Sequence, residues 1–222
     1  MDRDTRLGLL FFLVAVAGVP VAGAGAVVLG GGRAPAPLRG VLAYAHDMLE
    51  ERGLANVEGH AALLHEACAD LGLSPHLLGG IMFAESRGRS GQVSSAGALG
   101  LMQLVPAAAR DAARRIGQEL PTDDGELRDS LLHDDRLNVR LGAAHVKWLL
   151  DNRGDWDLEA VLVSYNAGRA KLFRWIEEHG SYASWVRSEE EARARGDRTT
   201  GSLAYARQVL RARDELRERG VL

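Results

Sequence analysis

Cysteine is almost absent from this chain of 222 residues, and that scarcity excludes several classes of protein. The single cysteine, Cys68, leaves no intramolecular disulfide to hold the fold together. It falls on an apolar helical stripe, which favours a buried structural thiol over a nucleophile. It also lies far beyond the N-terminal segment, so it is not the lipid-bearing cysteine of a lipoprotein.

Aromatic residues are scarce as well, at 5% of the chain, and neither sign of charge dominates, since the formal net charge is −3. Basic and acidic residues are interspersed, so the chain lacks the electrostatic footprint of a nucleic-acid-binding protein. The 7 histidines show no His-Glu-x-x-His or comparable ligand spacing. We therefore expect no metal, no other cofactor and no nucleic-acid partner.

The N-terminus carries one charge-free stretch, Leu7–Gly32, after a short head that contains Arg3 and Arg6. A signal peptide cleaved near Ala22–Ala24 would explain it, and so would an uncleaved span, for which about 20 apolar residues suffice. The apolar residues Ala26–Leu29 continue past the cleavage site, which favours the anchor.

Residues 1–32 are accordingly interpreted as a signal peptide or membrane anchor, and residues 33–37 as a linker rich in Pro. We expect residues 38–222 to form one domain on the periplasmic side of the cytoplasmic membrane, anchored or secreted.

The rest of the chain is rich in Ala, Leu, Arg and Glu, and no segment alternates with period two, which predicts an all-α fold. Helices are expected over Leu38–Leu49 (stopped by Gly53), Val57–Leu71, Ser74–Ser86, Pro106–Ile116, Leu137–Gly154, Leu158–Gly168 and Ser202–Arg219. A Gly- and Ser-rich loop is expected over Arg87–Ala98 and a polar connection over Asp123–Asp135. The charged stretch between Trp185 and Leu203 is interpreted as a mobile flap or a disordered segment.

Glu85 occupies the last place of an apolar stripe that also contains Leu78, Ile81 and Met82. A carboxyl held beside apolar side chains at a helix end has a raised pKa and suits a general acid. Periodicity alone leaves a second interpretation open, in which the helix has ended and Glu85 faces water.

Four short motifs extend this observation, namely Glu85-Ser86, the run from Gly100 to Gln103 (Gly-Leu-Met-Gln), the run from Ser164 to Gly168 (Ser-Tyr-Asn-Ala-Gly) and a late Tyr205. In this order they resemble the family 1 lytic transglycosylases of the Slt type, over roughly Leu71 to Leu210. Ser164 departs from the family, which usually has Ala there. The resemblance implies a lysozyme-like (goose-type or Slt) helical catalytic domain.

The resemblance also implies a role for each matched residue. Glu85 would be the sole catalytic acid and base, and Tyr165 the catalytic tyrosine that hydrogen-bonds it. The residues implied in substrate binding are Ser86, Gly100, Leu101, Met102, Gln103, Asn166 and Tyr205. Gly97 and Gly100 would let the backbone approach a bulky sugar closely.

The implied reaction cleaves the bond between N-acetylmuramic acid and N-acetylglucosamine in peptidoglycan glycan strands and closes a 1,6-anhydro ring. Two alternatives stay open. A hydrolytic muramidase of the goose type would need a second acid to activate water, for which Asp123 or Asp124 is available. A non-catalytic peptidoglycan-binding scaffold would be marked by loss of Glu85 or Tyr165, and both are present.

Overall fold

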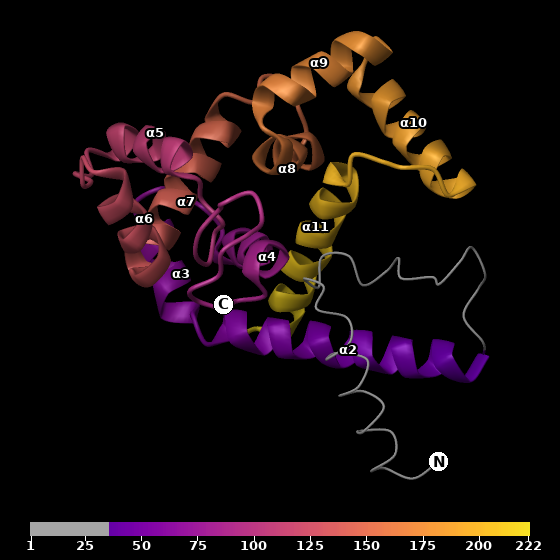
Figure 1. The fold of residues 1–222 in the computed structure, drawn as a ribbon, viewed down its shortest axis with the longest axis horizontal. Coiled ribbons are helices and arrows are strands. Elements are labelled where there is room, and N and C mark those ends of the chain that lie inside the picture. The colour runs from indigo at the N-terminus through magenta and orange to yellow at the C-terminus, as the bar shows by residue number, and fades with distance from the viewer. Residues whose placement is uncertain (1–35) are drawn as a thin grey trace. The chain divides into compact units, whose positions relative to one another are not determined.

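The computed structural model describes residues 36–222, with side chains from Leu42 onwards (Figure 1). The segment predicted to anchor or export the chain, residues 1–32, and most of the predicted linker lie outside these residues. None of the helices in the described part of the chain has the length and apolar character that crossing a membrane requires.

The prediction of an all-α fold is confirmed, since residues 36–222 contain no strand beyond isolated bridges in the loop after Ser86. The helices are α2 (Ala36–Glu58), α3 (Ala61–Ala69), α4 (Pro75–Ser86), α5 (Pro106–Ile116), α6 (Asp124–His133), α7 (Asp135–Asp151), α8 (Leu158–Ala167), α9 (Arg169–His179), α10 (Tyr182–Arg195) and α11 (Ser202–Arg219).

The chain divides into two compact units between Arg52 and Gly53, which lies inside α2. Helices α3 to α11 belong to the second unit, residues 53–222, and so does every residue of the site described below. The predicted stop at Gly53 is wrong, because α2 continues to Glu58. Gly53 itself packs beside Phe83, where an added Cβ would lie 2.8 Å from Phe83 Cε2.

Local capping signals explain why several helices begin where the sequence predicts. Ser74 caps α4, since its hydroxyl accepts a hydrogen bond from Leu77 N, and Pro75 occupies the first helical position. Asp157 caps α8 in the same way through Ala160 N, at 2.8 Å. The left-handed backbone of Arg87, with φ at 56°, ends α4 directly after the Glu-Ser pair.

The predicted polar connection over Asp123–Asp135 is wrong, because most of it forms α6. Asp123 accepts a hydrogen bond from Glu126 N at 2.9 Å and so caps this helix. Leu127 and Leu131 are its fully buried side chains. Three leucines in ten residues, two of them adjacent, are too few to reveal a helix by periodicity.

The stretch after Trp185, interpreted as a flap or disordered, is also helical as far as Arg195. Ser181 caps this helix, α10, by accepting from Ser184 N at 3.1 Å, and Trp185 is 1% exposed. The Trp185 ring stacks on Trp175 of α9, with ring centroids 5.2 Å apart. These ring contacts between helices cannot be read from periodicity, which explains why α9 and α10 were missed.

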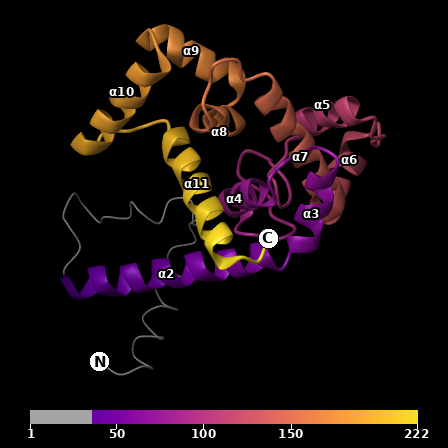
Figure 2. The same cartoon turned by 180° about the vertical axis from the view of Figure 1, so that it is seen from behind.

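Helices α4 and α11 lie side by side in both views of the molecule (Figures 1 and 2). Glycines on α4 make this approach possible. A Cβ at Gly80 would lie 2.6 Å from the carbonyl oxygen of Val209 on α11, and one at Gly79 would meet Leu216 and Leu222. The close packing brings the C-terminal end of α4 to the first turns of α11.

The loop between α4 and α5 is held by Asn138 of α7, which is fully buried. Its side chain donates to the carbonyls of Leu99 and Leu131, both at 2.9 Å, and accepts from Met102 N at 2.8 Å. Gly100 is required here, because its φ is +73° and a Cβ would lie 2.5 Å from Asn138 Nδ2. The glycine therefore serves close packing between this loop and α7.

Candidate active site

Glu85 lies half-buried in the last turn of α4. Its Oε1 accepts a hydrogen bond of 2.7 Å from the hydroxyl of Tyr205, on α11. Burial raises the pKa of Glu85 from 4.5 to about 7, and the hydrogen bond from Tyr205 partly opposes that rise. The carboxyl is therefore poised to release and to take up a proton near neutral pH.

The tyrosine that hydrogen-bonds Glu85 is Tyr205, and not Tyr165 as the resemblance implied. Tyr165 was expected to hydrogen-bond Glu85, but its hydroxyl donates to the carbonyl oxygen of Met102 at 3.0 Å, and Tyr205 takes the place beside Glu85. Burial, together with the nearby Glu85, raises the pKa of both tyrosines well above the usual value. Both hydroxyls are therefore neutral donors at any physiological pH.

Ser86, Leu101 and Met102, which the resemblance implied in substrate binding, have buried side chains. Leu101 and Met102 have no exposed area at all, and Met102 packs against Gly142 of α7. Ser86 is 3% exposed, and its hydroxyl donates to Met82 O one turn earlier in α4.

Besides Tyr205, the predicted binding residues Gln103 and Asn166 remain accessible. Gln103 is partly exposed, and its amide donates to the carbonyls of Gly100 and Gln92, at 2.9 and 3.3 Å. Asn166, at the end of α8, is exposed, and its Oδ1 accepts a hydrogen bond of 2.7 Å from the Ser202 hydroxyl. This bond ties α8 to the first turn of α11, the helix that carries Tyr205.

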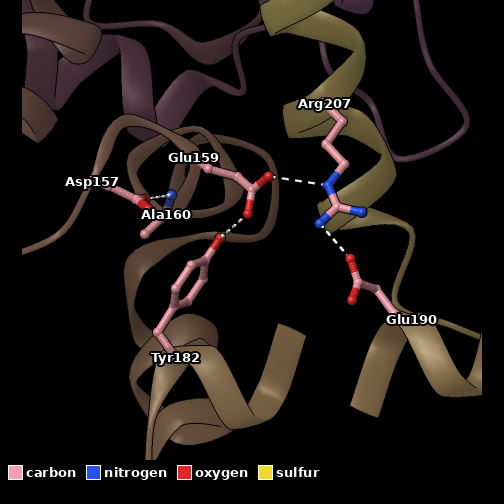
Figure 3. A network of polar contacts seen from close by, with 6 residues as sticks. All are labelled: Asp157, Glu159, Ala160, Tyr182, Glu190 and Arg207. Atoms are coloured by element: carbon pink, nitrogen blue, oxygen red, sulfur yellow. Dashed lines mark hydrogen bonds and ion pairs between the residues drawn. The ribbon is translucent and has the colours of Figure 1, made fainter. Parts of the chain in front are cut away.

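A second polar network links α8 to α11 (Figure 3). Glu159 of α8 accepts from Arg207 Nε at 3.1 Å and from the Tyr182 hydroxyl at 3.2 Å. Arg207 also donates to Glu190 of α10 at 2.7 Å. Because Arg207 lies two residues after Tyr205, the network fixes the rotation of α11 next to Glu85.

Sequence reasoning missed the Glu159–Arg207 pair, and no local signal could have found it. The two residues are 48 positions apart, and the charges around Arg207 resemble an ordinary solvated helix face. Their proximity follows only from the packing of α8 on α11.

No second carboxylate contributes to the pKa shift of Glu85 in the described part of the chain. Asp123 and Asp124, the acids that a hydrolytic mechanism would require, have structural partners. Asp123 caps α6, and Asp124 pairs with Arg110 at 2.6 Å. No group of three or more His, Cys, Asp or Glu residues that could hold a metal ion occurs within residues 36–222.

Residues 63–187 match the family model of the transglycosylase SLT domain. The endo-type membrane-bound lytic murein transglycosylase A of Klebsiella pneumoniae subsp. pneumoniae is 38% identical over 117 residues, which cover 49% of this chain and 55% of that relative. The protein of the same name from Salmonella enteritidis is 36% identical over 117 residues, which again cover 49% of this chain and 55% of that relative. The chain thus spans about half the length of the curated relatives it matches.

An inactive variant of lytic transglycosylase Slt from Pseudomonas aeruginosa has a similar fold, with a TM-score of 0.58 and 24% identity, over 72% of this chain and 24% of that one. This likeness concerns the fold. The resemblance inferred from the four motifs is confirmed, and the matched segment covers more than half of the sequence. The chain therefore belongs to the transglycosylase SLT domain family, with a lysozyme-like helical fold.

Proposed function

We propose that the chain is a peptidoglycan lytic transglycosylase in which Glu85 is the only acid and base. The observation that carries the proposal is the half-buried Glu85 carboxyl, which accepts a hydrogen bond from Tyr205 and has a pKa raised to about 7. Among the described residues, no second carboxylate contributes to that shift. A hydrolase on this fold would need that second acid to activate water.

Glu85 would begin the reaction in its protonated form and give its proton to the oxygen that links muramic acid to glucosamine. The bond from that oxygen to muramoyl C1 breaks, and the N-acetyl carbonyl of the substrate stabilises the cationic centre. The ionised Glu85 then removes the proton of the muramoyl C6 hydroxyl, whose oxygen bonds to C1. The proton that Glu85 gave is thereby restored.

The hydrogen bond from Tyr205 has a defined place in this cycle. It is strongest when Glu85 is ionised, because a charged acceptor strengthens a hydrogen bond. It therefore stabilises the intermediate stage, between the loss and the return of the proton. Gln103 and Asn166 are the accessible polar side chains that we assign to sugar binding.

Mass spectrometry of the fragments released from isolated peptidoglycan tests the proposal. We expect 1,6-anhydromuramoyl ends with the native chain and none with Glu85→Gln. Reducing muramoyl ends would instead identify a hydrolytic muramidase. Glycan binding without any cleavage would identify a scaffold.

We also propose that the domain acts outside the cytoplasmic membrane, held there by residues 1–32. The charge-free stretch Leu7–Gly32 and the names of the relatives, which describe them as membrane-bound, support this. A reporter that is active only in the periplasm, fused after Arg39, should be active. A silent reporter with the protein recovered from the cytosol would refute the placement.

A further inference from the structure

A cluster of aromatic and cationic side chains begins one ring contact away from the active site. The ring of Tyr165 lies 5.4 Å from that of His145, and His145 stacks on Trp148 of the same helix, α7, at 6.1 Å. The cluster then continues from α7 to α9 through Arg169. It is thus continuous with the residues beside Glu85.

Arg169 is surrounded by aromatic faces. Its guanidinium carbon lies 5.6 Å from the ring centre of Trp148, 5.0 Å from that of Trp156 and 5.3 Å from that of Phe173. Trp156 and Phe173 pack on each other at 4.9 Å. Such packing holds a guanidinium in one orientation and leaves its hydrogen-bond donors uncommitted.

Arg115 of α5 approaches Trp148 as well, with its guanidinium carbon 4.3 Å from the ring centre. Neither Arg115 nor Arg169 has an ion-pair partner among residues 36–222, and Arg169 Nη1 is buried there without a hydrogen-bond partner. Burial, followed by the charge of Arg115, lowers the pKa of His145 to about 4 against the opposing charge of Asp111, so this histidine is neutral. The two arginines therefore supply the positive charge of the cluster.

The cluster is open to solvent at its edge. Phe173 is 50% exposed, Arg115 is exposed, and Arg169 is only partly buried. A fixed guanidinium with free donors matches the planar geometry of a carboxylate, and exposed aromatic faces match the apolar face of a sugar ring.

We propose that Arg169 and Arg115, with the rings of Trp148, Trp156 and Phe173, form a subsite for a carboxylate on the peptide branch of the glycan strand. The inference rests on the proposed function, because peptidoglycan supplies both the sugar and the carboxylate-bearing peptide. It extends that function by making the enzyme selective for strands that keep their peptides.

The test compares three soluble glycan substrates, which carry intact peptides, peptides with amidated carboxyls, or no peptides. For the native chain we expect the lowest KM on intact peptides. Arg169→Gln should raise that KM roughly ten- to a hundredfold, the range expected for a lost charge-assisted hydrogen bond. The KM values of the three substrates should then differ less from one another. Arg193→Gln, which removes an exposed arginine on α10, is the matched control and should leave the order of the substrates unchanged.

Further variants separate binding from folding. Arg115→Gln removes an exposed charge, which the fold should tolerate, and we expect a smaller rise in the same KM. Arg169→Lys keeps the charge and should restore part of the selectivity. If Arg169→Gln and Arg115→Gln change the KM of all three substrates equally, or change none of the three KM values, the subsite is refuted.

Binding measured in the Glu85→Gln background distinguishes failure of the subsite from failure of the proposed function. If the native chain cleaves none of the substrates, the transglycosylase proposal fails. Co-sedimentation with the same strands then decides the subsite separately. The subsite is supported if the double variant Arg169→Gln,Glu85→Gln binds more weakly than Glu85→Gln only to the strands that carry intact peptides. It is refuted if the two variants bind all three kinds of strand equally.

Discussion

The environment of Glu85 links catalysis to stability through a single proton. Its pKa is about 7 in the folded protein, against 4.5 for a glutamate carboxyl in water, so the folded chain keeps this proton over a pH range in which the unfolded chain has lost it. Within that range the free energy of unfolding falls as the pH rises. The decrease begins near pH 4.5 and is complete above pH 7, where it amounts to about 3 kcal/mol.

Glu85→Gln should therefore stabilise the fold at pH 8 while abolishing turnover. Glutamine cannot ionise, and its amide oxygen can still accept the hydrogen bond of Tyr205. We expect the melting temperature to exceed that of the native chain at pH 8 and to match it at pH 4. A variant that melts lower than the native chain at pH 8 would show that burial does not raise the pKa of Glu85.

The two tyrosines differ in what each hydroxyl stabilises, and this difference can be measured. Tyr205→Phe removes the hydrogen bond that lowers the pKa of Glu85, so that pKa should rise above 7. The alkaline limb of the profile of kcat/KM against pH should move to higher pH. Turnover should fall by about 10²-fold, because the carboxyl loses its positioning contact.

Tyr165→Phe is the matched control, since its hydroxyl contacts Met102 O and not Glu85. It should lower stability by about 1–3 kcal/mol, through the buried carbonyl left without a donor, and leave the alkaline limb in place. Equal displacement of the limb in both variants would contradict the separate roles.

At the scale of helices, the site depends on how α8, α10 and α11 are fixed to one another. Glu159 is the centre of this arrangement, with its side chain 22% exposed between Arg207 and Tyr182. Glu190 binds the same arginine from α10, but its side chain is 50% exposed. Solvent weakens the outer pair more than the inner one.

Glu159→Gln should consequently lower kcat severalfold and stability by about 1 kcal/mol, because α11 loses its charged contact with α8. Glu190→Gln removes the same charge from the exposed end and should change neither quantity appreciably. Measurement of kcat and of urea unfolding for both variants checks this. Equal effects would mean that α10, and not α8, sets the position of α11.

Over the whole molecule, the site exists because the early helix α4 packs directly on the last helix, α11. Glu85 and Tyr205 are 120 positions apart, and the contact between their helices depends on Gly79 and Gly80. At Gly80 an added Cβ would meet the backbone of α11, whereas at Gly79 the nearest atom, 2.9 Å away, belongs to the flexible side chain of Leu222.

Gly80→Ala should therefore lower stability by about 1–3 kcal/mol, as overpacking does, despite the better helix propensity of Ala. It should also lower turnover, because α11 must move away from α4 and Tyr205 from Glu85. Gly79→Ala should lower stability less, since the Leu222 side chain can move away from an added methyl group and the backbone of α11 cannot. Thermal unfolding and initial rates of the two variants test this order, and a reversed order would refute the backbone contact as its cause.

The sequence by itself determined the helix starts at Ser74 and Pro106, the all-α class and the family, together with Glu85 as the candidate acid. These features rest on local chemistry, namely capping, the fixed φ of proline and motif order, which act over a few residues.

Tertiary structure alone decided which tyrosine bonds Glu85, why Leu101 and Met102 are buried, and how far the pKa of Glu85 rises. It also brought Arg115 of α5 and Arg169 of α9, which lie far apart in the chain, to the ring of Trp148. Burial and contacts between distant helices depend on how closely the helices pack, and neither periodicity nor a motif contains that information.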